Sequence, residues 1–284
     1  MVPLRNKKKE IGMSKDNGLV SIIMPSYNCG QFVEKTILSV QAQTYSDWEI
    51  LFVDDSSTDD TEAIIKSIND NRIKFYRNDI NSGAAVSRNM ALKEASGRWI
   101  AFLDSDDLWV PTKLEKQVAF MEKYGYNFTY TCYSEIDSNS NDTGVRVSGP
   151  SKITKSGMYA FCWPGCLTVM YDRNVIGNIQ IKDIKKNNDY AMWLKICEKS
   201  DCYLLNECLA KYRRGRVGSV SSHSINTMVG WHYKLWREAI GKPPVLAFCL
   251  TLLNVVCGFW KKNYYVKCHS CQGSISCRSD CSIK

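Results

Sequence analysis

Two clusters of carboxylates carry the chemistry that this sequence suggests, and each follows a short apolar run. Asp54 and Asp55 come after one run, and Asp104 and Asp106 come after another. If the runs are parallel strands of one open sheet, their carboxyl ends share the edge where ligands bind. Carboxylates so close together repel one another, and a bound cation would remove that repulsion. Two acids one residue apart in extended backbone point the same way. That arrangement suits Mg²⁺ or Mn²⁺ carrying phosphate oxygens.

The alternative for Asp104 and Asp106 is that they are turn and cap residues before the next helix. The surrounding elements favour a ligand site, because the first half of the chain alternates strand and helix. Strands are predicted at 19–24, 48–53, 72–77 and 99–103, and helices at 31–43, 59–68, 84–95 and 113–124. Asp59, three residues before Glu62, predicts a capping box at the second helix. This alternation is typical of a doubly wound, mostly parallel α/β sheet.

The second half is less regular and contains no clear linker, so we expect a single domain with a C-terminal helical extension. Strands are predicted at 128–135, 167–171, 203–205 and 208–212, a polar loop at 137–144, and helices at 189–199 and 224–240. Apolar residues at helical spacing make the last of these helices amphipathic.

Charge is distributed unevenly along the chain. The net charge is +8, but residues 205–284 carry 12 basic and 3 acidic side chains, so the preceding part is close to neutral. A basic end favours an anionic partner, either membrane lipid or nucleic acid. The long apolar stretch 243–260 lies within this end and is interrupted by Thr251, Asn254 and Gly258. We expect it to lie in a membrane interface or to pack on the domain, and we expect no nucleic-acid partner.

Composition excludes several classes of protein. With 44% hydrophobic and 23% charged residues, the chain is neither disordered throughout nor collagen-like. The number of cysteines, 13, is odd, and residues 1–18 show no apolar run of a signal peptide. We therefore expect a disordered basic N-terminus, reduced thiols and a cytoplasmic protein. The cysteine pairs within 268–284 are too close together for a zinc ribbon, so a disordered tail is predicted there.

Five motifs follow one another along the chain. They are 20–28 (VSIIMPSYN), 39–44 (SVQAQT), 53–59 (VDDSSTD), Asn81-x-Gly83 with Arg88-Asn89, and 104–107 (DSDD). In order and spacing the sequence resembles glycosyltransferase family 2 from about residue 19 to 220. The stretch 185–193 resembles the subgroup that builds bacterial surface polysaccharides, teichuronic-acid type enzymes among them. The resemblance implies a GT-A fold, inverting chemistry, a nucleotide-activated sugar that is commonly UDP-linked, and Mn²⁺ or Mg²⁺.

The resemblance assigns a nucleotide-sugar site to residues of the first half. Pro25 and Tyr27 resemble the uracil pocket, in which the Tyr27 ring could stack on the base. Asp55 resembles the carboxylate that accepts from uracil N3–H, a contact that favours uracil over cytosine. Arg88 resembles the basic residue that reaches the nucleotide or its diphosphate. Gly83 would allow close backbone approach at the start of the following helix.

The same resemblance assigns the reacting end of the site. Asp104 resembles the carboxylate that contacts the ribose and the metal shell, and Asp106 resembles the direct metal ligand. Because Asp107 follows directly, the alignment with the family motif could be shifted by one residue. Asp189 resembles the general base that takes the acceptor hydroxyl proton, and its place at a helix start is expected to keep it ionised. The wider family usually has Glu-Asp where this chain has Asn188-Asp189, so any role of that Glu in positioning the acceptor is in doubt.

Two tryptophans are candidates for the acceptor side. Trp163 and Trp193 are assigned there because tryptophan often stacks on sugar faces, and the alternative for both is a place in the core. Asp183 is a weaker candidate for the base. A diphosphate-contacting segment is also implied around three arginines, without indicating which of them binds: Arg213, Arg214 and Arg216.

The predicted function is transfer of a sugar from a UDP-sugar to a saccharide acceptor, expected to be lipid-linked, in bacterial surface polysaccharide synthesis. Residues 19–110 would form the nucleotide-binding half and 111–222 the acceptor half of the GT-A domain. Residues 223–267 would dock on the inner face of the cell membrane. An inactive homologue that binds nucleotide sugar without transferring it is the alternative. A dehalogenase-type phosphatase fits worse, since its aspartate pair should follow the first strand. A nucleotidyltransferase would need a glycine-rich loop there.

Overall fold

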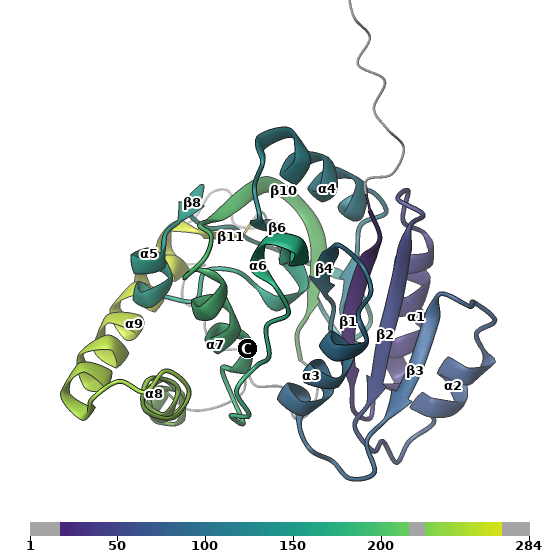
Figure 1. Ribbon diagram of the computed structural model, residues 1–284, viewed down its shortest axis with the longest axis horizontal. Coiled ribbons are helices and arrows are strands. Elements are labelled where there is room, and N and C mark those ends of the chain that lie inside the picture. Colours follow the sequence, from purple (N-terminus) through teal and green to yellow (C-terminus); the bar gives the residue numbers. More distant parts are fainter. Residues whose placement is uncertain (1–17, 216–224, 269–284) are drawn as a thin grey trace, which may run out of the picture.

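A computed structural model describes residues 18–215 and 225–268, and Figure 1 shows their arrangement. A mixed sheet runs through the molecule, with helices on both of its faces. The predicted basic N-terminus, the cysteine-rich tail beyond Cys268, and Arg216 lie outside the described residues. The predicted domain boundaries stay predictions.

The first half forms the parallel sheet with alternating helices that the sequence predicts. Its strands are β1 (Val20–Ser26), β2 (Trp48–Asp54), β3 (Ile73–Arg77) and β4 (Trp99–Phe102). Its helices are α1 (Gly30–Gln41), α2 (Thr61–Ser67), α3 (Ala84–Glu94) and α4 (Lys113–Tyr124). β1 pairs in parallel with β2 and β4, and β2 pairs in parallel with β3. The carboxyl ends of these strands therefore meet at one edge of the sheet.

Two hydrophobic cores lie on opposite faces of this sheet. Ile22 and Met24 belong to one core with residues of α1, whereas Ile23 belongs to the other with residues of α3. Successive side chains of a strand point to opposite faces, so a fully apolar strand needs cover on both. All 7 residues of β1 are buried, which is what a doubly wound sheet requires.

The second half adds strands of both directions. They are β5 (Leu108–Trp109), β6 (Phe128–Ile136), β7 (Asp142–Val147), β8 (Lys152–Ile153), β9 (Met170–Asp172), β10 (Cys202–Arg213) and β11 (Val266–Cys268). The main path of the sheet runs β11-β7-β6-β9-β4-β1-β2-β3, and β10 pairs beside β6. β9 lies antiparallel to both β4 and β6 and so joins the two halves. Because β10 is parallel to β6 while β7 is antiparallel to it, the sheet as a whole is mixed.

Two local predictions for this half are wrong. The loop predicted at 137–144 is partly strand, since β7 begins at Asp142 and forms a hairpin with β6. The strands predicted at 203–205 and 208–212 are one strand, β10, whose pairing with β6 shifts on either side of Cys208. Both differences arise because the pairing partner β6 supplies hydrogen bonds that local sequence pattern does not reveal.

Short helices connect these strands. They are α5 (Lys155–Ala160), a 3₁₀ turn (Cys166–Thr168), α6 (Arg173–Ile176) and α7 (Asn188–Ile196). α7 is fastened to the sheet by Trp193, whose ring packs edge-on to Phe102 of β4 with centroids 5.1 Å apart. Because Trp193 is fully buried, the start of α7 is held at the same edge as the end of β4.

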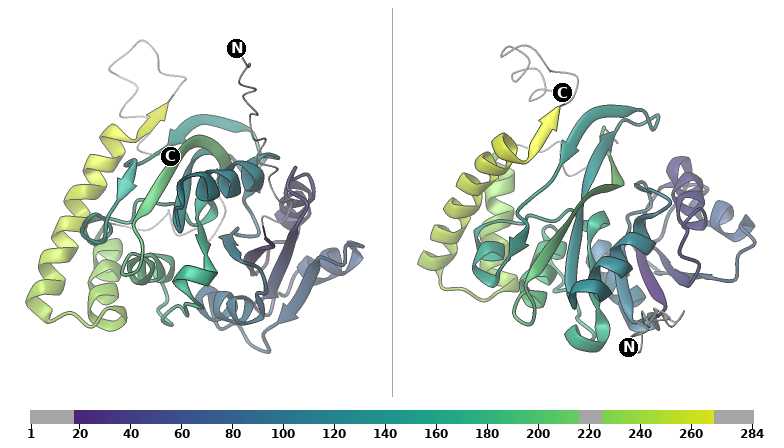
Figure 2. Two further views of the ribbon diagram at one scale, coloured as in Figure 1. Left: turned by 45° about the horizontal axis from the view of Figure 1, so that its top comes forward. Right: turned by 90° about the horizontal axis from the view of Figure 1, so that it is seen from above.

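The C-terminal extension consists of two helices packed along the outside of the domain. α8 (Ile225–Lys234) continues into a π-helical turn (Leu235–Ala239), which confirms the helix predicted at 224–240, and α9 (Pro244–Tyr264) follows. Figure 2 shows α9 along the outer edge beside α8. The polar interruptions Thr251 and Asn254 are buried against the domain. The Asn254 side-chain amide donates to the backbone carbonyls of Tyr159 and Ala160, at 3.0 and 2.8 Å.

Candidate active site

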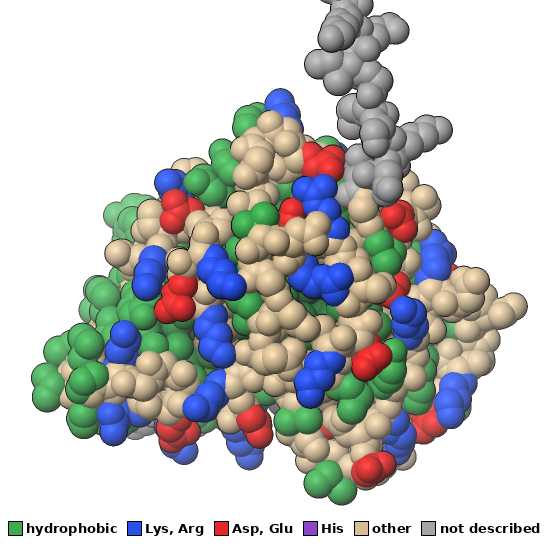
Figure 3. All heavy atoms as spheres, in the orientation of Figure 1, with side chains coloured by type: hydrophobic (Ala, Val, Ile, Leu, Met, Phe, Trp, Pro, Cys, Tyr) green, Lys and Arg blue, Asp and Glu red, His purple; other side chains and the backbone are tan. Residues whose placement is uncertain are grey.

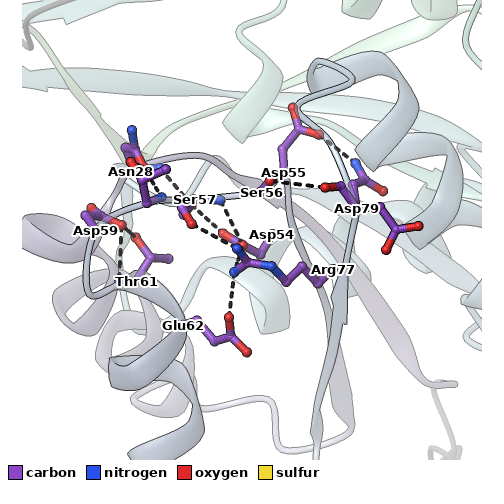
Figure 4. Close-up of polar contacts among 12 residues, drawn as sticks. Asn28, Asp54, Asp55, Ser56, Ser57, Asp59, Thr61, Glu62, Arg77 and Asp79 are labelled. Atoms are coloured by element: carbon purple, nitrogen blue, oxygen red, sulfur yellow. Dashed lines mark hydrogen bonds and ion pairs between the residues drawn. The ribbon is translucent and has the colours of Figure 1, made fainter.

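The loop after β2 is held in shape by Asp54, which Figure 4 shows among its partners. The Asp54 carboxylate is fully buried and accepts from the amide and the hydroxyl of Ser57. It also pairs with Arg77 at 2.7 Å, and Arg77 pairs in turn with Glu62. This carboxylate is therefore satisfied by the loop that it organises.

Asp59 fixes the neighbouring loop after β1. Its carboxylate accepts from the backbone amide of Gly30 at 2.9 Å and from the Thr61 hydroxyl at 2.6 Å (Figure 4). The predicted capping box is wrong, because α2 starts at Thr61 and Glu62 bonds Lys66 and Arg77 instead of returning to the cap. Asp59 thus joins the β1 and β2 loops into one wall of the sheet edge.

Asp55 is buried beside the loop that leads into α3. It accepts from the Asn78 amide at 2.6 Å and from the backbone amides of Ser82 and Gly83 at 2.9 and 2.7 Å. Gly83 has φ of +90°, a backbone conformation that glycine adopts without strain. A carboxylate can accept about four hydrogen bonds, one at each lone-pair site. Because Asp55 already accepts three, it can accept one further hydrogen bond. Asn78 directly follows β3, just as Asp55 directly follows β2. Asn78 is not among the residues predicted from the sequence, although its place after the third strand is a signal that it lies at the same edge.

The two residues assigned to the uracil pocket lie in different environments. Pro25 is buried inside β1 and pairs in register with Val53, so its ring faces protein. Tyr27, two residues later, is 44% exposed at the sheet edge. Of the two, only Tyr27 offers a ring face that a base could stack on.

The three aspartates after β4 divide into two kinds. Asp107 is buried and accepts from the Arg213 backbone amide at 2.7 Å, whereas Asp104 and Asp106 are half-buried. Burial, and then the charges of Asp106 and Asp104, raise the pKa of Asp107 well above its ordinary value. Asp107 is therefore part of the framework, and Asp104 and Asp106 are the two aspartates of this turn that remain partly accessible.

Arg213 holds this acidic turn from the end of β10. Its Nε donates to the Asp106 carbonyl at 2.7 Å, and its guanidinium lies over the Phe32 ring, 4.7 Å from the centroid. Arg214 pairs with Glu135 at 2.8 Å. Both arginines are thus engaged with protein, and no pattern in the sequence indicated that Arg213 serves the aspartate turn.

Arg88 connects the two acidic regions of the site. It is buried, and its guanidinium donates to Asp104 at 2.6 Å and to the side-chain carbonyl of Asn188 at 2.7 Å. Asn188 is the first residue of α7, so this bridge ties α3, the turn after β4 and α7 together. The neutral Asn188 takes the place of an acid and gives Arg88 an acceptor without adding a second negative charge beside Asp104.

Asp189 lies next to this bridge and is half-buried. Burial raises the pKa of its carboxyl above the ordinary value, although Arg88 and the Tyr190 amide act in the opposite direction. The donors at the helix start act in the expected direction, but loss of water outweighs them in the net shift of this pKa. A raised pKa suits a general base, which works best when its pKa approaches the operating pH.

The two tryptophans assigned to the acceptor are core residues. Trp163 is 5% exposed, donates from its indole nitrogen to the Gly157 carbonyl at 2.9 Å, and packs against Trp260 of α9. Trp193 is fully buried against β4 and β6. Neither ring is exposed at the surface, so neither can stack on a sugar. Both tryptophans are therefore core residues, and the assignment to the acceptor side is wrong.

The residues after β4 fit a divalent cation. Asp104 and Asp106 supply oxygen ligands on half-buried side chains, and their mutual repulsion with Asp107 is the kind that a cation relieves. Among the described residues no preformed group of three ligating side chains exists. A hard cation would therefore need oxygens from a bound diphosphate and water to complete its shell, as Mg²⁺ commonly does.

Backbone strain also gathers at this edge. Four non-glycine residues among those described have positive φ, and three of them, Asn28, Ser56 and Asn187, lie in loops of the site. Such conformations persist where surrounding structure enforces them, typically at ligand sites. Asn187 directly precedes α7, so this turn sets the direction in which Asp189 enters the site.

The doubly wound sheet and its acidic edge agree with the GT-A fold. The sequence profile of glycosyl transferase family 2 matches residues 21–182, and the chain belongs to that family. It is 43% identical over 198 residues to TuaG of Bacillus subtilis, named as a glycosyltransferase of teichuronic acid biosynthesis, covering 69% of this chain and 79% of that protein.

A second relative carries a more detailed name. The chain is 42% identical over 216 residues, 75% of its length and 83% of the relative's, to WfgD of Escherichia coli. WfgD is named UDP-Glc:alpha-D-GlcNAc-diphosphoundecaprenol beta-1,3-glucosyltransferase. Among solved structures, Staphylococcus aureus TarS (residues 1–349) with UDP-GlcNAc superposes with a TM-score of 0.63 at 20% identity, over 82% of this chain and 70% of that one. That likeness confirms the fold.

Proposed function

We propose that this glycosyltransferase moves a sugar from a UDP-sugar to a saccharide carried on a lipid diphosphate, with inversion at the anomeric carbon. The observation that carries the proposal is the Arg88 bridge, which joins the Asp104 turn to the start of α7 beside Asp189. Donor-side and acceptor-side carboxylates are thereby held in one site. The 42% identity to WfgD, whose name gives both substrates, supports the assignment of donor and acceptor.

The donor assignment rests on the edge formed by the β1 and β2 loops. Tyr27 is exposed there, and Asp55 has one acceptor place left beside three internal donors. The N3–H of uracil can donate this further hydrogen bond to Asp55. The corresponding ring nitrogen of cytosine carries a lone pair instead, so it would be repelled by the carboxylate. A uracil base stacked on Tyr27 therefore satisfies both groups.

Asp189 supplies the acceptor chemistry. As the acceptor hydroxyl attacks the anomeric carbon, its proton passes to the Asp189 carboxylate, and the sugar–phosphate bond breaks on the opposite face of the sugar. Arg88 keeps the base close to Asp104 through Asn188. Asp106, with Asp104, would hold Mn²⁺ or Mg²⁺, which when bound neutralises charge on the departing diphosphate.

α9 provides a surface for membrane docking. It is 21 residues long and contains an 18-residue window with a mean hydropathy of 1.6, enough to cross a bilayer, but Asn254 bonds to the domain and Thr251 is buried beside it. Its outward face is apolar, and Figure 3 shows hydrophobic side chains gathered along the edge that α9 forms in Figure 1. The most exposed are Val245, Phe248, Val256, Phe259 and Tyr264. A helix with its polar residues turned to the protein lies along a lipid surface more readily than across it.

The basic contribution to docking is smaller than the sequence suggests. Lys261 is turned inward, where it donates to the Trp163 carbonyl at 2.8 Å and burial lowers its pKa to about 8. Lys262 and Lys267 stay exposed beside the apolar face. Each exposed lysine near anionic lipid contributes about 1 kcal/mol, so apolar insertion contributes more to docking than charge does. A cytoplasmic enzyme docked in this way would meet a lipid-linked acceptor at the membrane surface.

Full-length enzyme tests the proposal with UDP-glucose, UDP-GlcNAc and GDP-mannose, Mn²⁺, and a synthetic GlcNAc-diphosphate-lipid acceptor. We expect transfer from a UDP-sugar, loss of transfer in EDTA and in Asp106→Ala, and a product of inverted anomeric configuration by NMR. Asp183→Asn, an exposed acid outside the site, is the matched control. Transfer from GDP-mannose alone would refute the donor, and full transfer in EDTA would refute the metal.

The inactive-homologue alternative makes a different prediction for the same assay. A binding module would bind UDP with metal in calorimetry but release none from any UDP-sugar in the presence of acceptor. The buried Arg88–Asp104 and Arg88–Asn188 contacts argue against it, since they keep the reacting end of the site assembled.

A further inference from the structure

Two cysteines that the proposed reaction does not use lie side by side on neighbouring strands. Cys132 of β6 and Cys208 of β10 are register partners, and the pairing shifts on both sides of Cys208. Neighbouring strands are about 4.8 Å apart, and disulfides join Cα atoms about 4.4–6.8 Å apart. The two backbones are therefore already within the range that a disulfide needs.

The two thiols are chemically unequal. Cys132 is buried and its Sγ donates to the Asn206 side-chain carbonyl at 3.3 Å. Cys208 is half-buried beside Cys132. The neighbouring Cys132 and Arg146 lower the pKa of the Cys208 thiol to about 6, although burial and Asp142 act in the opposite direction. Cys208 is thus the more accessible sulfur of the pair, and Cys132, whose S–H is donated to Asn206, is the buried one.

A cavity reaches Cys132, while Cys208 does not line it and is reached from its own half-buried side. The cavity has a volume of about 180 Å³, and its lining includes Cys132, Arg146, Ser148, Asn206 and Lys267. Arg146, which acts on Cys208, favours the charged, reactive form of that thiol. Among the described residues no third metal-ligating side chain joins the pair, so a metal centre is not the natural use of this cluster.

We propose that Cys132 and Cys208 form a hydroperoxide-reactive dithiol site that closes to an intramolecular disulfide. The Cys208 thiolate attacks the terminal peroxide oxygen, the O–O bond breaks, and the leaving alkoxide or hydroxide takes a proton from water. The resulting sulfenic acid at Cys208 is attacked by the Cys132 sulfur, the S–S bond forms, and water leaves with the Cys132 proton. The two sulfurs together lose two electrons, and the hydroperoxide gains them.

The experiment treats the reduced full-length protein with hydrogen peroxide, alkylates the remaining thiols and maps all cysteines by mass spectrometry. We expect a cross-linked peptide pair containing Cys132 and Cys208. Cys132→Ser should accumulate a dimedone adduct at Cys208, because the resolving thiol is gone. Cys208→Ser should form neither product. Cys249→Ser, which removes an exposed cysteine on α9, is the matched control and should behave as wild type.

A second measurement uses the wild-type chain alone and needs no variant to fold. Pulse alkylation with iodoacetamide under mildly acidic conditions should label Cys208 before the exposed Cys249, because only a thiolate reacts. Arg146→Met should slow that labelling by about tenfold for each pKa unit it restores. The proposal is overturned if cross-links form only among other cysteines, or if Cys249 reacts first, in protein with an unchanged circular dichroism spectrum.

Discussion

Asp189 has a raised pKa, as Asp107 does, but it stays half-buried beside the Arg88–Asn188 bond instead of fixing a loop. Asp54, Asp59 and Asp107 each accept internal donors that fix a loop. A carboxylate engaged in this way has little capacity to take a proton from a ligand. At the scale of single residues, the framework acids are therefore those whose oxygens accept hydrogen bonds that fix a loop of the protein. The acids proposed to react remain partly accessible.

Replacing Asp189 by asparagine removes the proton acceptor and keeps the shape of the side chain. Transfer should fall by about 10²–10⁴-fold, with little change in UDP affinity, because the nucleotide contacts lie on other loops. Initial rates at saturating acceptor and calorimetric binding of UDP measure the two effects. Asp183→Asn should be nearly neutral in both. A variant that turns over at nearly the wild-type rate would rule Asp189 out as the base.

The raised pKa of Asp189 also predicts a pH dependence with opposite signs for activity and stability. Activity should decline as pH falls through the raised pKa, because the base becomes protonated. The folded state holds the Asp189 proton more tightly than the unfolded chain, so this stabilisation is present in acid and lost as pH rises through the folded pKa. Asp189→Asn should therefore be at least as stable as wild type at neutral pH, with a smaller difference in acid, measured by urea unfolding.

Asn188 is the position where this chain departs from the wider family, and the structure gives it a positioning role. Asn188→Ala leaves one donor of the buried Arg88 guanidinium without its acceptor. We expect the free energy of unfolding to fall by about 1–3 kcal/mol, as measured in urea. The exposed Asn178→Ala is the control. Equal stabilities for Asn188→Ala and wild type would show that the bridge contributes nothing to stability.

At the scale of elements, α4 begins with a residue that no local pattern would place inside. Lys113 is fully buried, its Nζ has no hydrogen-bond partner among the described residues, and it lies 3.8 Å from the Trp109 ring centroid. Burial lowers the pKa of Lys113 well below its ordinary value. The unfolded chain binds this proton more readily than the folded one. Folding at neutral pH therefore carries a penalty that disappears as pH rises toward the unfolded pKa.

Lys113→Met should therefore stabilise the protein at neutral pH, because it fills the same space without a buried amine. Lys116→Met, in the same helix but exposed and paired with Glu207, should change stability by less than about 0.5 kcal/mol. Urea unfolding at neutral and at alkaline pH distinguishes the two. The gain for Lys113→Met should shrink at alkaline pH, and a loss of stability at neutral pH would mean that the contact with Trp109 outweighs the buried charge.

At the scale of the whole molecule, the sheet edge and the apolar face of α9 are separate surfaces of one domain (Figures 1 and 3). α9 is joined to the domain by Asn254 and by packing of Trp260 on Trp163. Removing the whole helix would therefore expose core residues along with the docking face. Substitutions confined to the outward side chains are the sharper test.

Replacing Val245, Phe248, Val256 and Phe259 by serine should abolish sedimentation with anionic liposomes while leaving the fold intact. The reason is loss of apolar insertion, which contributes more to docking than the exposed lysines do. Serine at Leu38 and Ile80, which are equally exposed on other elements, is the matched control and should leave binding unchanged. If the α9 variant sediments as wild type does, the enzyme docks through another surface.

Much of the fold could be read from the sequence because its signals are local. Mostly apolar runs such as 48–53 need cover on both faces. Helical spacing between these runs supplies that cover, so the parallel half follows from periodicity. The acidic edge follows as well, since strand ends of one sheet meet at one side. The sequence predicts α9 only in part, because its apolar composition is evident but the orientation of the helix is not. Thr251 and Asn254 interrupt the apolar segment in the sequence, and in the structure they form the face that packs on the domain.

Order and spacing along the chain were enough to establish the strand–helix alternation, the residues at the sheet edge and the family resemblance. Three-dimensional contacts were needed to show which acids are framework, that Trp163 and Trp193 are core, and that Cys132 meets Cys208. The physical reason is that burial and partner choice depend on contacts between segments distant in sequence, such as Arg88 with Asn188, and these set both hydrogen bonding and pKa.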